Sequence, residues 1–214
     1  MIIIAIDGPA GAGKSTIAKA LAKKLSLRYL DTGAMYRAVT FLALERGVSL
    51  NDEQAVAKLA VDCVMDINDE SVVIDQIDVT LQIRGPRVTN AVSLVATNSL
   101  VRNELRNRQR EWATKFGGGV VEGRDIGSVV FPEATIKVYL TASPLVRAKR
   151  RVAQSGGDVV EIASEIAERD LRDSSRADSP LTKTFDAITV DTSDRTVDDV
   201  VSQIISLLNG VSKN

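Results

Sequence analysis

The chain has 214 residues, of which 44% are hydrophobic and 26% charged, as expected for one core domain with small inserted subdomains. Its 27 basic and 28 acidic side chains nearly cancel, which argues against binding to nucleic acid or to a membrane surface. Histidine is absent and Cys63 is the single cysteine, so the sequence excludes a Ser-His triad, an intramolecular disulfide and a cysteine zinc site.

The first apolar segment, residues 2–6, is short and rich in β-branched side chains, as is typical of a central parallel strand. It is too short for a signal-peptide core or a membrane span, and no run of about 18 apolar residues occurs elsewhere, so we expect a cytoplasmic protein. After a glycine-rich loop, Ile17, Leu21 and Leu25 recur at helical spacing, which predicts a helix from about Lys14.

The middle of the chain changes between helical and strand periodicity. The expected elements are a helix over residues 34–46, strands at 71–74 and 79–84, and a long helix over 93–115 that ends at the glycines 117–119. The short strands predict a small antiparallel sheet inserted near residues 64–84.

The C-terminal half alternates between strands and helices. The expected elements are strands at 120–121 and 136–140, a helix from Ser143-Pro144 to the glycines 156–157, a helix over 159–172, a strand at 187–190 and a helix over 197–208. This alternation predicts an α/β fold with a parallel sheet flanked by helices.

A phosphate-binding pattern follows the first strand. Its residues are Gly8, Pro9, Ala10, Gly11, Ala12, Gly13, Lys14 and Ser15, and Thr16 extends it. Lys14 would reach the β- and γ-phosphates of ATP, and the Ser15 hydroxyl would ligate Mg²⁺. A glycine-rich turn with a chance Lys-Ser pair is the alternative, but the strand before it and the helix after it favour a phosphate site.

Charged residues continue the apolar stripe of the helix predicted after residue 159. The stripe reads Ile162, Ile166, Arg169, Asp173 and Arg176. Arginines in such a position indicate a cleft for a polar ligand, because a guanidinium can hold phosphate in a bidentate manner. A frayed helix end with an Arg169–Asp173 ion pair would give the same pattern.

Two further clusters have the same ambiguity. Arg147, Lys149, Arg150 and Arg151 predict either a lid that neutralises a transferring phosphoryl group or a solvated basic face. Residues 122–125, Glu-Gly-Arg-Asp, follow the strand at 120–121, where open α/β sheets bind ligands, but an ordinary surface turn is the alternative.

Several longer stretches resemble the bacterial-type cytidylate kinases, and the resemblance covers nearly the whole chain. The matching stretches are residues 6–9 running into the phosphate loop, 30–37 (Leu-Asp-Thr-Gly-Ala-Met-Tyr-Arg), 122–127 (Glu-Gly-Arg-Asp-Ile-Gly), 148–151, 168–173, and Arg176 before 179–181. The second and third stretches are diagnostic in a way that the phosphate loop is not.

This resemblance implies a nucleoside-monophosphate kinase that transfers a phosphoryl group from MgATP to CMP or dCMP. We also expect the protein to be a monomer. It implies one P-loop kinase domain over residues 1–214, an acceptor-binding region at about 34–114 that contains the β insert, and a helical lid at about 144–160. Another P-loop kinase, for UMP or shikimate, and a non-enzymatic nucleotide switch are the alternatives. The glycines 117–119 superficially resemble the substrate loop of shikimate kinase.

The resemblance also implies roles for individual residues. The acceptor phosphate would be held by Arg37, Arg124 and Arg176, the ribose by Arg169 and Asp173, and cytosine by Ser93, Arg102 and Asp125, with Thr32 and Tyr36 completing the CMP site. The catalytic charges would come from Lys14, Arg124, Arg147 and Arg151.

Overall fold

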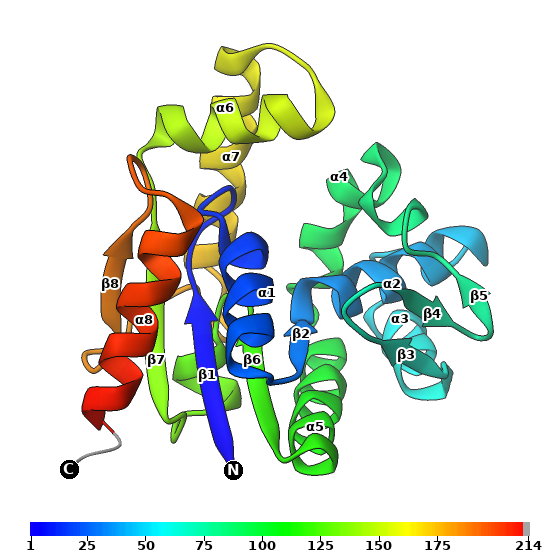
Figure 1. Cartoon of the computed structure of the whole chain (residues 1–214). Helices are drawn as coiled ribbons and strands as arrows, with labels where there is room; N and C mark the ends of the chain where they lie inside the picture. The colour runs from blue at the N-terminus through cyan, green and yellow to red at the C-terminus, as the bar shows by residue number, and fades with distance from the viewer. Residues whose placement is uncertain (212–214) are drawn as a thin grey trace.

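The computed structural model describes residues 1–211, and within them five parallel strands form one sheet in the order β2-β6-β1-β7-β8. These strands are β1 (Ile2–Asp7), β2 (Tyr29–Asp31), β6 (Gly118–Glu122), β7 (Ile136–Thr141) and β8 (Ile188–Asp191). Helices cover both faces of the sheet (Figure 1). The predicted α/β fold with a parallel sheet is therefore confirmed, whereas the short strand β2 was not predicted.

The helices described in the structure are α1 (Lys14–Leu25), α2 (Thr32–Glu45), α3 (Glu53–Asp62), α4 (Pro86–Val95), α5 (Ser99–Phe116), α6 (Pro144–Ser155), α7 (Val159–Ser174) and α8 (Val197–Val211). Two shorter segments are the 3₁₀-helix η1 (Gln82–Arg84) and the π-helical turn η2 (Ile126–Val130). As predicted, α6 begins after Ser143, whose hydroxyl accepts the Val146 N–H, and Pro144 occupies its first turn. The sequence reasoning missed α3 and η2.

The central strand β1 is buried on both faces because its apolar side chains alternate between two cores. Ile4 and Ile6 belong to the core that includes residues of α1 and α8. Ile3 and Ala5 point to the opposite core, which includes residues of α2, α5 and η2. The sheet is thereby held between two helical layers, and its carboxyl edge stays open to support loops.

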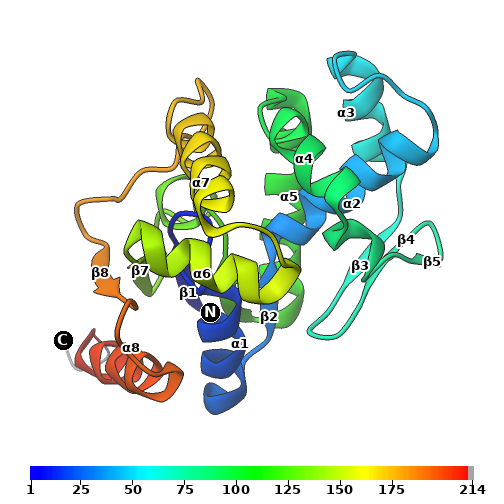
Figure 2. The same ribbon diagram turned by 90° about the horizontal axis from the view of Figure 1, so that it is seen from above.

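A second sheet lies beyond α2 (Figure 2). It is antiparallel, in the order β3-β4-β5, with β3 (Met65–Ile67), β4 (Val72–Ile74) and β5 (Ile77–Asp78). Val72 and Ile74 are buried with Ala38 and Leu42 of α2 in a third core cluster. The small antiparallel insert is confirmed.

The strand predicted over residues 79–84 is wrong. The Asp78 carboxylate accepts hydrogen bonds from both the backbone N–H and the hydroxyl of Thr80, which turns the chain at the end of β5. The Ile83 N–H then donates to the Val79 carbonyl, so these two apolar residues are buried on one side of a helical turn, while Leu81 is 83% exposed. The alternating apolar residues at 79, 81 and 83 thus belong to a helical turn and not to a strand.

The single helix predicted over residues 93–115 is also wrong, because two helices occupy this region. The Asn98 side chain accepts hydrogen bonds from the backbone N–H groups of Leu100 and Val101 and so begins α5 as an N-cap. Ser93 and Arg102 therefore come from different helices, α4 and α5.

The three glycines at 117–119 have two different roles. Gly117 ends α5 in the left-handed conformation, whereas Gly118 and Gly119 are the first residues of β6. Gly118 lies opposite Ile2, at the amino edge of the sheet and at the other end of β1 from the phosphate loop. The glycines therefore do not correspond to a substrate loop. No helix within residues 1–211 is long and apolar enough to span a membrane.

The two neighbouring glycines provide a matched test of this edge. A Cβ at Gly118 would lie 2.1 Å from the Ile2 carbonyl oxygen, whereas no atom of residues 1–211 outside the immediate neighbours lies within 4 Å of a Cβ at Gly117. We expect Gly118→Ala to lower the free energy of unfolding by on the order of 3 kcal/mol or more. Gly117→Ala should lower it by only about 1–2 kcal/mol, the penalty of a positive φ. Equal losses in urea unfolding would contradict this account.

Candidate active site

The phosphate-loop pattern forms the connection between β1 and α1, in the predicted context. Gly8 has a φ of 149°, and a Cβ there would lie 2.1 Å from the Leu140 carbonyl oxygen, so only glycine fits beside β7. Gly13 is left-handed and supplies no side-chain cap, so α1 begins at Lys14 with its first backbone N–H groups facing the loop. Such a helix start is a binding site for a phosphate group.

Lys14 is buried at the centre of the site. Its Nζ donates hydrogen bonds to the carbonyl oxygens of Gly8 (2.9 Å) and Pro9 (2.8 Å), within the loop itself. Burial, and next the charge of Arg124, lower the pKa of Lys14, while the Glu122 carboxylate opposes this shift. The lysine is therefore a desolvated cation that a phosphate group would stabilise.

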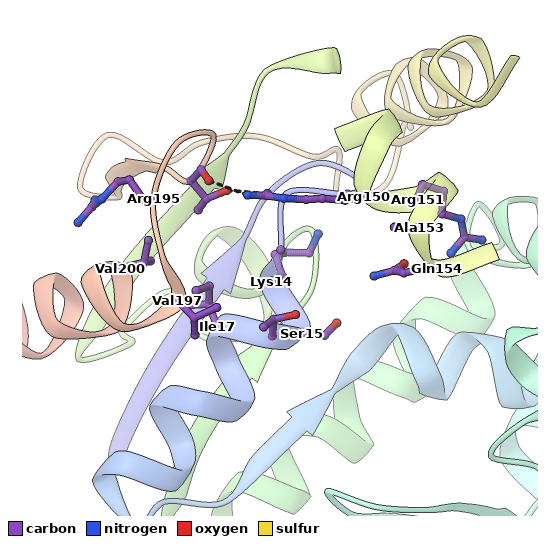
Figure 3. Close-up of a pocket in the computed structure, with 14 residues that line it drawn as sticks. Lys14, Ser15, Ile17, Arg150, Arg151, Ala153, Gln154, Arg195, Val197 and Val200 are labelled. Carbon is purple, nitrogen blue, oxygen red and sulfur yellow. Dashed lines mark hydrogen bonds between the residues drawn. The ribbon is translucent and has the colours of Figure 1, made fainter. Parts of the chain in front are cut away.

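A cavity of about 440 Å³, named here the loop cavity, lies beside the phosphate loop. Its lining residues are Gly11, residues 13–17, Arg150, Arg151, Ala153, Gln154, Thr192, Arg195, Val197 and Val200. In Figure 3 the loop lies between basic side chains of α6 and apolar side chains of α8. Arg150 fixes this side of the cavity, because its guanidinium donates to the hydroxyl (2.9 Å) and the carbonyl (2.6 Å) of Thr192.

A second and smaller cavity, of about 80 Å³, is named here the arginine cavity. Its lining residues are Lys14, Asp31, Thr32, Gly33, Tyr36, Val92, Ser93, Ala96, Arg102, Glu122, Gly123, Arg124, Asp125, Arg169, Asp173 and Arg176. It contains every residue predicted for the acceptor site except Arg37. The two cavities share Lys14, so the buried ammonium group lies where they meet.

Three arginines in the arginine cavity surround one carboxylate. Asp173 accepts a hydrogen bond from Arg124 Nε at 2.9 Å and lies 3.8 Å from Arg176 Nη1. Arg169 is the third arginine, so three positive charges surround one negative charge. Burial would raise the pKa of Asp173, but the arginines, Arg124 first, hold it below its ordinary value. Burial, and next Arg124, lower the pKa of Arg169 to about 10. The sequence left open a frayed helix end with an Arg169–Asp173 ion pair, but the ion pairs of residues 1–211 do not include this one.

Several guanidinium N–H groups here are buried without a hydrogen-bond partner among residues 1–211. They are Nε and Nη2 of Arg176, Nε of Arg169 and Nε of Arg102. An unpaired buried donor is costly, so such groups indicate a site for a ligand that accepts hydrogen bonds. The excess of positive charge specifies an anion.

Arg37 does not line either cavity. Its Nη1 donates to the Ile83 carbonyl (3.0 Å) and to the Thr89 hydroxyl (2.8 Å). Arg37 follows Tyr36, which lines the arginine cavity, and burial, and next the charge of Arg169, lower the pKa of Arg37 to about 9. The structure therefore brings Arg37 near the arginine cavity but directs it towards η1 and α4.

Arg102 forms a fixed wall of the arginine cavity. Its side chain is 1% exposed and donates to the Ala96 carbonyl (3.1 Å) and to the Asp125 carboxylate (2.5 Å). The guanidinium also lies over the Tyr36 ring, 5.6 Å from its centroid. Ser93 lines the same cavity from α4. Side chains from three separate elements thus provide both hydrogen-bond donors and acceptors.

A further pair supports this wall and was missed by the sequence reasoning. Asp178 lies 3.8 Å from Arg102 Nε and accepts from Arg106 Nη1 at 2.8 Å. Burial would raise the pKa of Asp178, but hydrogen bonds from Arg106 and Ser179 lower it to about 2. The pair fastens the segment after α7 to α5.

The basic cluster of α6 is partly buried and not simply a solvated face. Arg147 donates to the Ala10 carbonyl (3.1 Å) and to the Asp170 carboxylate, and the same carboxylate accepts the Ala10 N–H at 3.0 Å. In this arrangement Arg147 lines neither cavity, whereas Arg151 lines the loop cavity. Lys149 is exposed. Asp170, which joins α7 to the phosphate loop, was not predicted.

The residues around Ser15 fit a magnesium ion that is also held by a nucleotide. Glu122 is buried at the end of β6, accepts a hydrogen bond from the Tyr29 hydroxyl and lies close enough to Ser15 for its hydroxyl to lower the Glu122 pKa. Burial, and next the charge of Asp31, raise the pKa of Glu122, while Lys14 opposes the shift. Hydroxyl and carboxylate oxygens are suitable Mg²⁺ donors, and the ion usually takes further ligands from substrate phosphates. Within residues 1–211 no group of three or more acidic, cysteine or histidine side chains forms a metal site of its own.

The fold and the phosphate loop define the chain as a P-loop kinase in structure. The shikimate kinase of Bacteroides thetaiotaomicron superposes with a TM-score of 0.50 at 16% identity, over 97% of this chain and 98% of that chain, a similarity of fold alone.

Sequence comparison identifies the family. The cytidylate kinase family model matches residues 4–210. The cytidylate kinase of Desulforamulus reducens is 49% identical over 211 residues, covering 95% of both chains. The cytidylate kinase of Geobacillus sp. strain WCH70 is 48% identical over 217 aligned residues, covering 97% of this chain and 96% of its own. The chain belongs to the cytidylate kinase family.

The Asp178 pair can be tested through the pH dependence of stability. A carboxylate whose pKa is lowered on folding stabilises the protein above its unfolded pKa and loses this effect as the pH falls through its folded pKa. We expect Asp178→Asn to lower the free energy of unfolding by about 2 kcal/mol at pH 7, and the loss to shrink between pH 3.8 and about 2. The exposed Asp66→Asn is the control for the charge change. A loss that does not vary with pH in urea unfolding would refute the role of Asp178.

Proposed function

We propose that the chain transfers the γ-phosphoryl group of ATP, bound with Mg²⁺, to the phosphate of CMP or dCMP. One observation carries this proposal in a member of the cytidylate kinase family: a phosphate-loop cavity and an arginine-lined cavity meet at the buried ammonium group of Lys14. Two sites that bind anions and share one cation provide a donor phosphate and an acceptor phosphate with a common point of contact.

The donor would occupy the loop cavity. The backbone N–H groups at the start of α1 would bind the β-phosphate, and the nucleoside would extend between α6 and α8. Lys14 would exchange its two carbonyl partners in the loop for oxygens of the β- and γ-phosphates. Mg²⁺, held by Ser15 and Glu122, would supply positive charge to the β- and γ-phosphate oxygens.

The acceptor would occupy the arginine cavity. Arg124 and Arg176 would hold the CMP phosphate, which satisfies the unpaired N–H groups of Arg176. Arg169 and Asp173 would hold the ribose. Arg37 would join the phosphate site after leaving the Ile83 carbonyl and the Thr89 hydroxyl.

The chemistry needs no general base. A phosphate monoester has a second pKa near ~6, so the acceptor oxygen is already largely ionised at neutral pH. The protein must align this oxygen with the γ-phosphorus and stabilise the charge that spreads over the transferring group. Lys14 and Arg124 adjoin the point at which the cavities meet, and the absence of histidine from the sequence is compatible with this mechanism.

We infer that residues at about 144–160 act as a lid and that residues at about 34–114 form the acceptor-binding region. Arg151 already lines the loop cavity. Arg147 would reach the transferring phosphoryl group only by leaving Asp170 and the Ala10 carbonyl. Lid closure would exchange these contacts for contacts with phosphate and would exclude water from the reaction.

The alternatives are supported less well. A nucleotide switch does not need a second anion site, and in this chain four arginines line such a cavity. In a shikimate kinase the glycines 117–119 would have to approach the acceptor, but Gly118 lies at the opposite edge of the sheet. A UMP kinase would have to place a uracil carbonyl beside the Asp125 carboxylate, where charge repulsion opposes it.

An acceptor panel in a coupled assay of ADP release tests the substrate. CMP and dCMP should be good acceptors, UMP at least about tenfold poorer in kcat/KM, and AMP, GMP and shikimate essentially inert, because a mismatched polar edge leaves buried groups unpaired. Asp125→Asn replaces a carboxylate oxygen by an N–H donor and should lower the CMP/UMP ratio without changing the KM for ATP. A wild-type enzyme that uses UMP as well as CMP would overturn the base assignment.

Removal of Lys14 tests phosphoryl transfer itself. Lys14→Ala should lower kcat by on the order of 100-fold or more, because it removes a positive charge from the transition state. Lys24→Ala is the matched control, since Lys24 lies on the exposed side of the same helix. Lys14→Ala activity within a few-fold of wild type, with an unchanged melting temperature, would contradict the mechanism.

A further inference from the structure

Asp7 is a buried carboxylate at the end of β1, immediately before the phosphate loop. It lines neither cavity, so it is not placed to touch either substrate. Its two oxygens are nevertheless fully committed: Oδ1 accepts the Ile126 N–H and Oδ2 accepts the Gly127 N–H, each at 2.8 Å. Both donors belong to the first residues of η2, more than a hundred residues away in the sequence.

One of the two N–H groups that Asp7 binds, that of Gly127, is a group that the Asp125 side chain would ordinarily cap. Asp125 is the N-cap residue of η2, and its carbonyl oxygen accepts from Val129 (2.9 Å) and Val130 (3.2 Å). The side chain of an aspartate at an N-cap usually accepts a hydrogen bond from the N–H of the second or third helical residue, here Gly127 or Ser128. The Asp125 side chain makes no such cap, because its carboxylate is held by Arg102 in the arginine cavity.

We propose that Asp7 is a positioning residue for base selection, which caps η2 in place of Asp125 and so leaves the Asp125 carboxylate free to face the acceptor base. The inference rests on the proposed function, because it assigns Asp7 to the acceptor site of that reaction. Asp7 would influence the acceptor site through the position of Asp125, and not through a contact with the substrate.

Electrostatics reinforce this arrangement. Burial raises the pKa of Asp7 to about 6, and the charge of Asp125 adds to that shift while the two backbone hydrogen bonds and Lys14 oppose it. The Coulomb repulsion between the Asp7 and Asp125 side chains disfavours a turn of Asp125 back towards η2. Arg102 attracts Asp125 in the opposite direction.

The lack of a side chain at Gly127 eases the approach of η2 to Asp7. A Cβ on Gly127 would lie 3.1 Å from the Lys137 side chain and 3.4 Å from Asp7 Oδ2, so the glycine lets the backbone approach the carboxylate. Since Gly8 follows Asp7 directly and Asp125 precedes Ile126, one side chain connects the start of the phosphate loop with the base-facing loop. These two hydrogen bonds add to the β1–β6 backbone pairing that holds the phosphate loop and the base-facing loop together.

Asp7→Asn tests the proposal, because the amide keeps the shape but presents a donor to one of the two N–H groups. We expect the KM for CMP to rise about tenfold, the effect of about 1.4 kcal/mol. The CMP/UMP ratio of kcat/KM should fall several-fold, and the KM for ATP should stay within about twofold. A purely structural role would not change the CMP/UMP ratio. Ser128→Ala is the control in the same segment, since the buried Ser128 hydroxyl has no hydrogen-bond partner among residues 1–211.

A double-mutant cycle shows whether Asp7 acts through Asp125. If it does, Asp7→Asn should lower the CMP/UMP ratio of wild type but leave the ratio of Asp125→Asn unchanged. Independent effects in the cycle, or an Asp7→Asn enzyme that loses kcat for both acceptors at a constant ratio, would overturn the proposal. If Asp7→Asn does not fold, Asp7→Glu, which keeps both acceptor oxygens, is measured in its place, and it should shift the ratio in the same direction by less. A wild-type enzyme that does not phosphorylate CMP would instead overturn the proposed function.

Discussion

The parallel pairing of β1 with β6 aligns Ile6 with Glu122, so the chain leaves both central strands at the same edge of the sheet. One of these exits becomes the phosphate loop and the other becomes the loop that carries Arg124 and Asp125. The two halves of the site are therefore brought together by backbone hydrogen bonds in the most buried part of the fold. Side chains such as Asp7 and Asp170 then adjust the position of each loop relative to the other.

The two helical layers around the sheet contribute to different cavities. One helical layer, with α1 and α8, forms the phosphate loop and one wall of the loop cavity. The other layer, together with α4 and α7, supplies the side chains of the arginine cavity. The two cavities have Lys14 in common. Arg147 of α6 and Asp170 of α7 both bond the phosphate loop at Ala10, so a movement of these helices relative to the loop would change both cavities together.

Local signals in the sequence predicted the features that depend on neighbouring residues. The phosphate loop, the buried strand before it and the start of α6 follow from glycines, β-branched runs and a capping serine within a few residues. The alternation of apolar and polar residues at 79–84 was misleading. Val79 and Ile83 are four residues apart, a spacing that fits one face of a strand, but here a turn held by Asp78 buries both of them. The resemblance to a family located most of the arginine cavity. Asp7 and Asp170 lie in stretches that match the family, but their roles, like that of Asp178, were missed because their partners are distant in the sequence.

The three arginines around Asp173 also have a consequence for how this protein can change over evolution. Buried like charges with unpaired donors oppose folding, so this part of the fold is held in place by the rest of the structure. Neutral replacements at these positions belong to the class of substitutions that stabilise a protein while weakening its activity. Selection for heat tolerance alone would therefore favour loss of these charges, and a thermostable descendant that keeps the three arginines must gain its stability elsewhere in the fold.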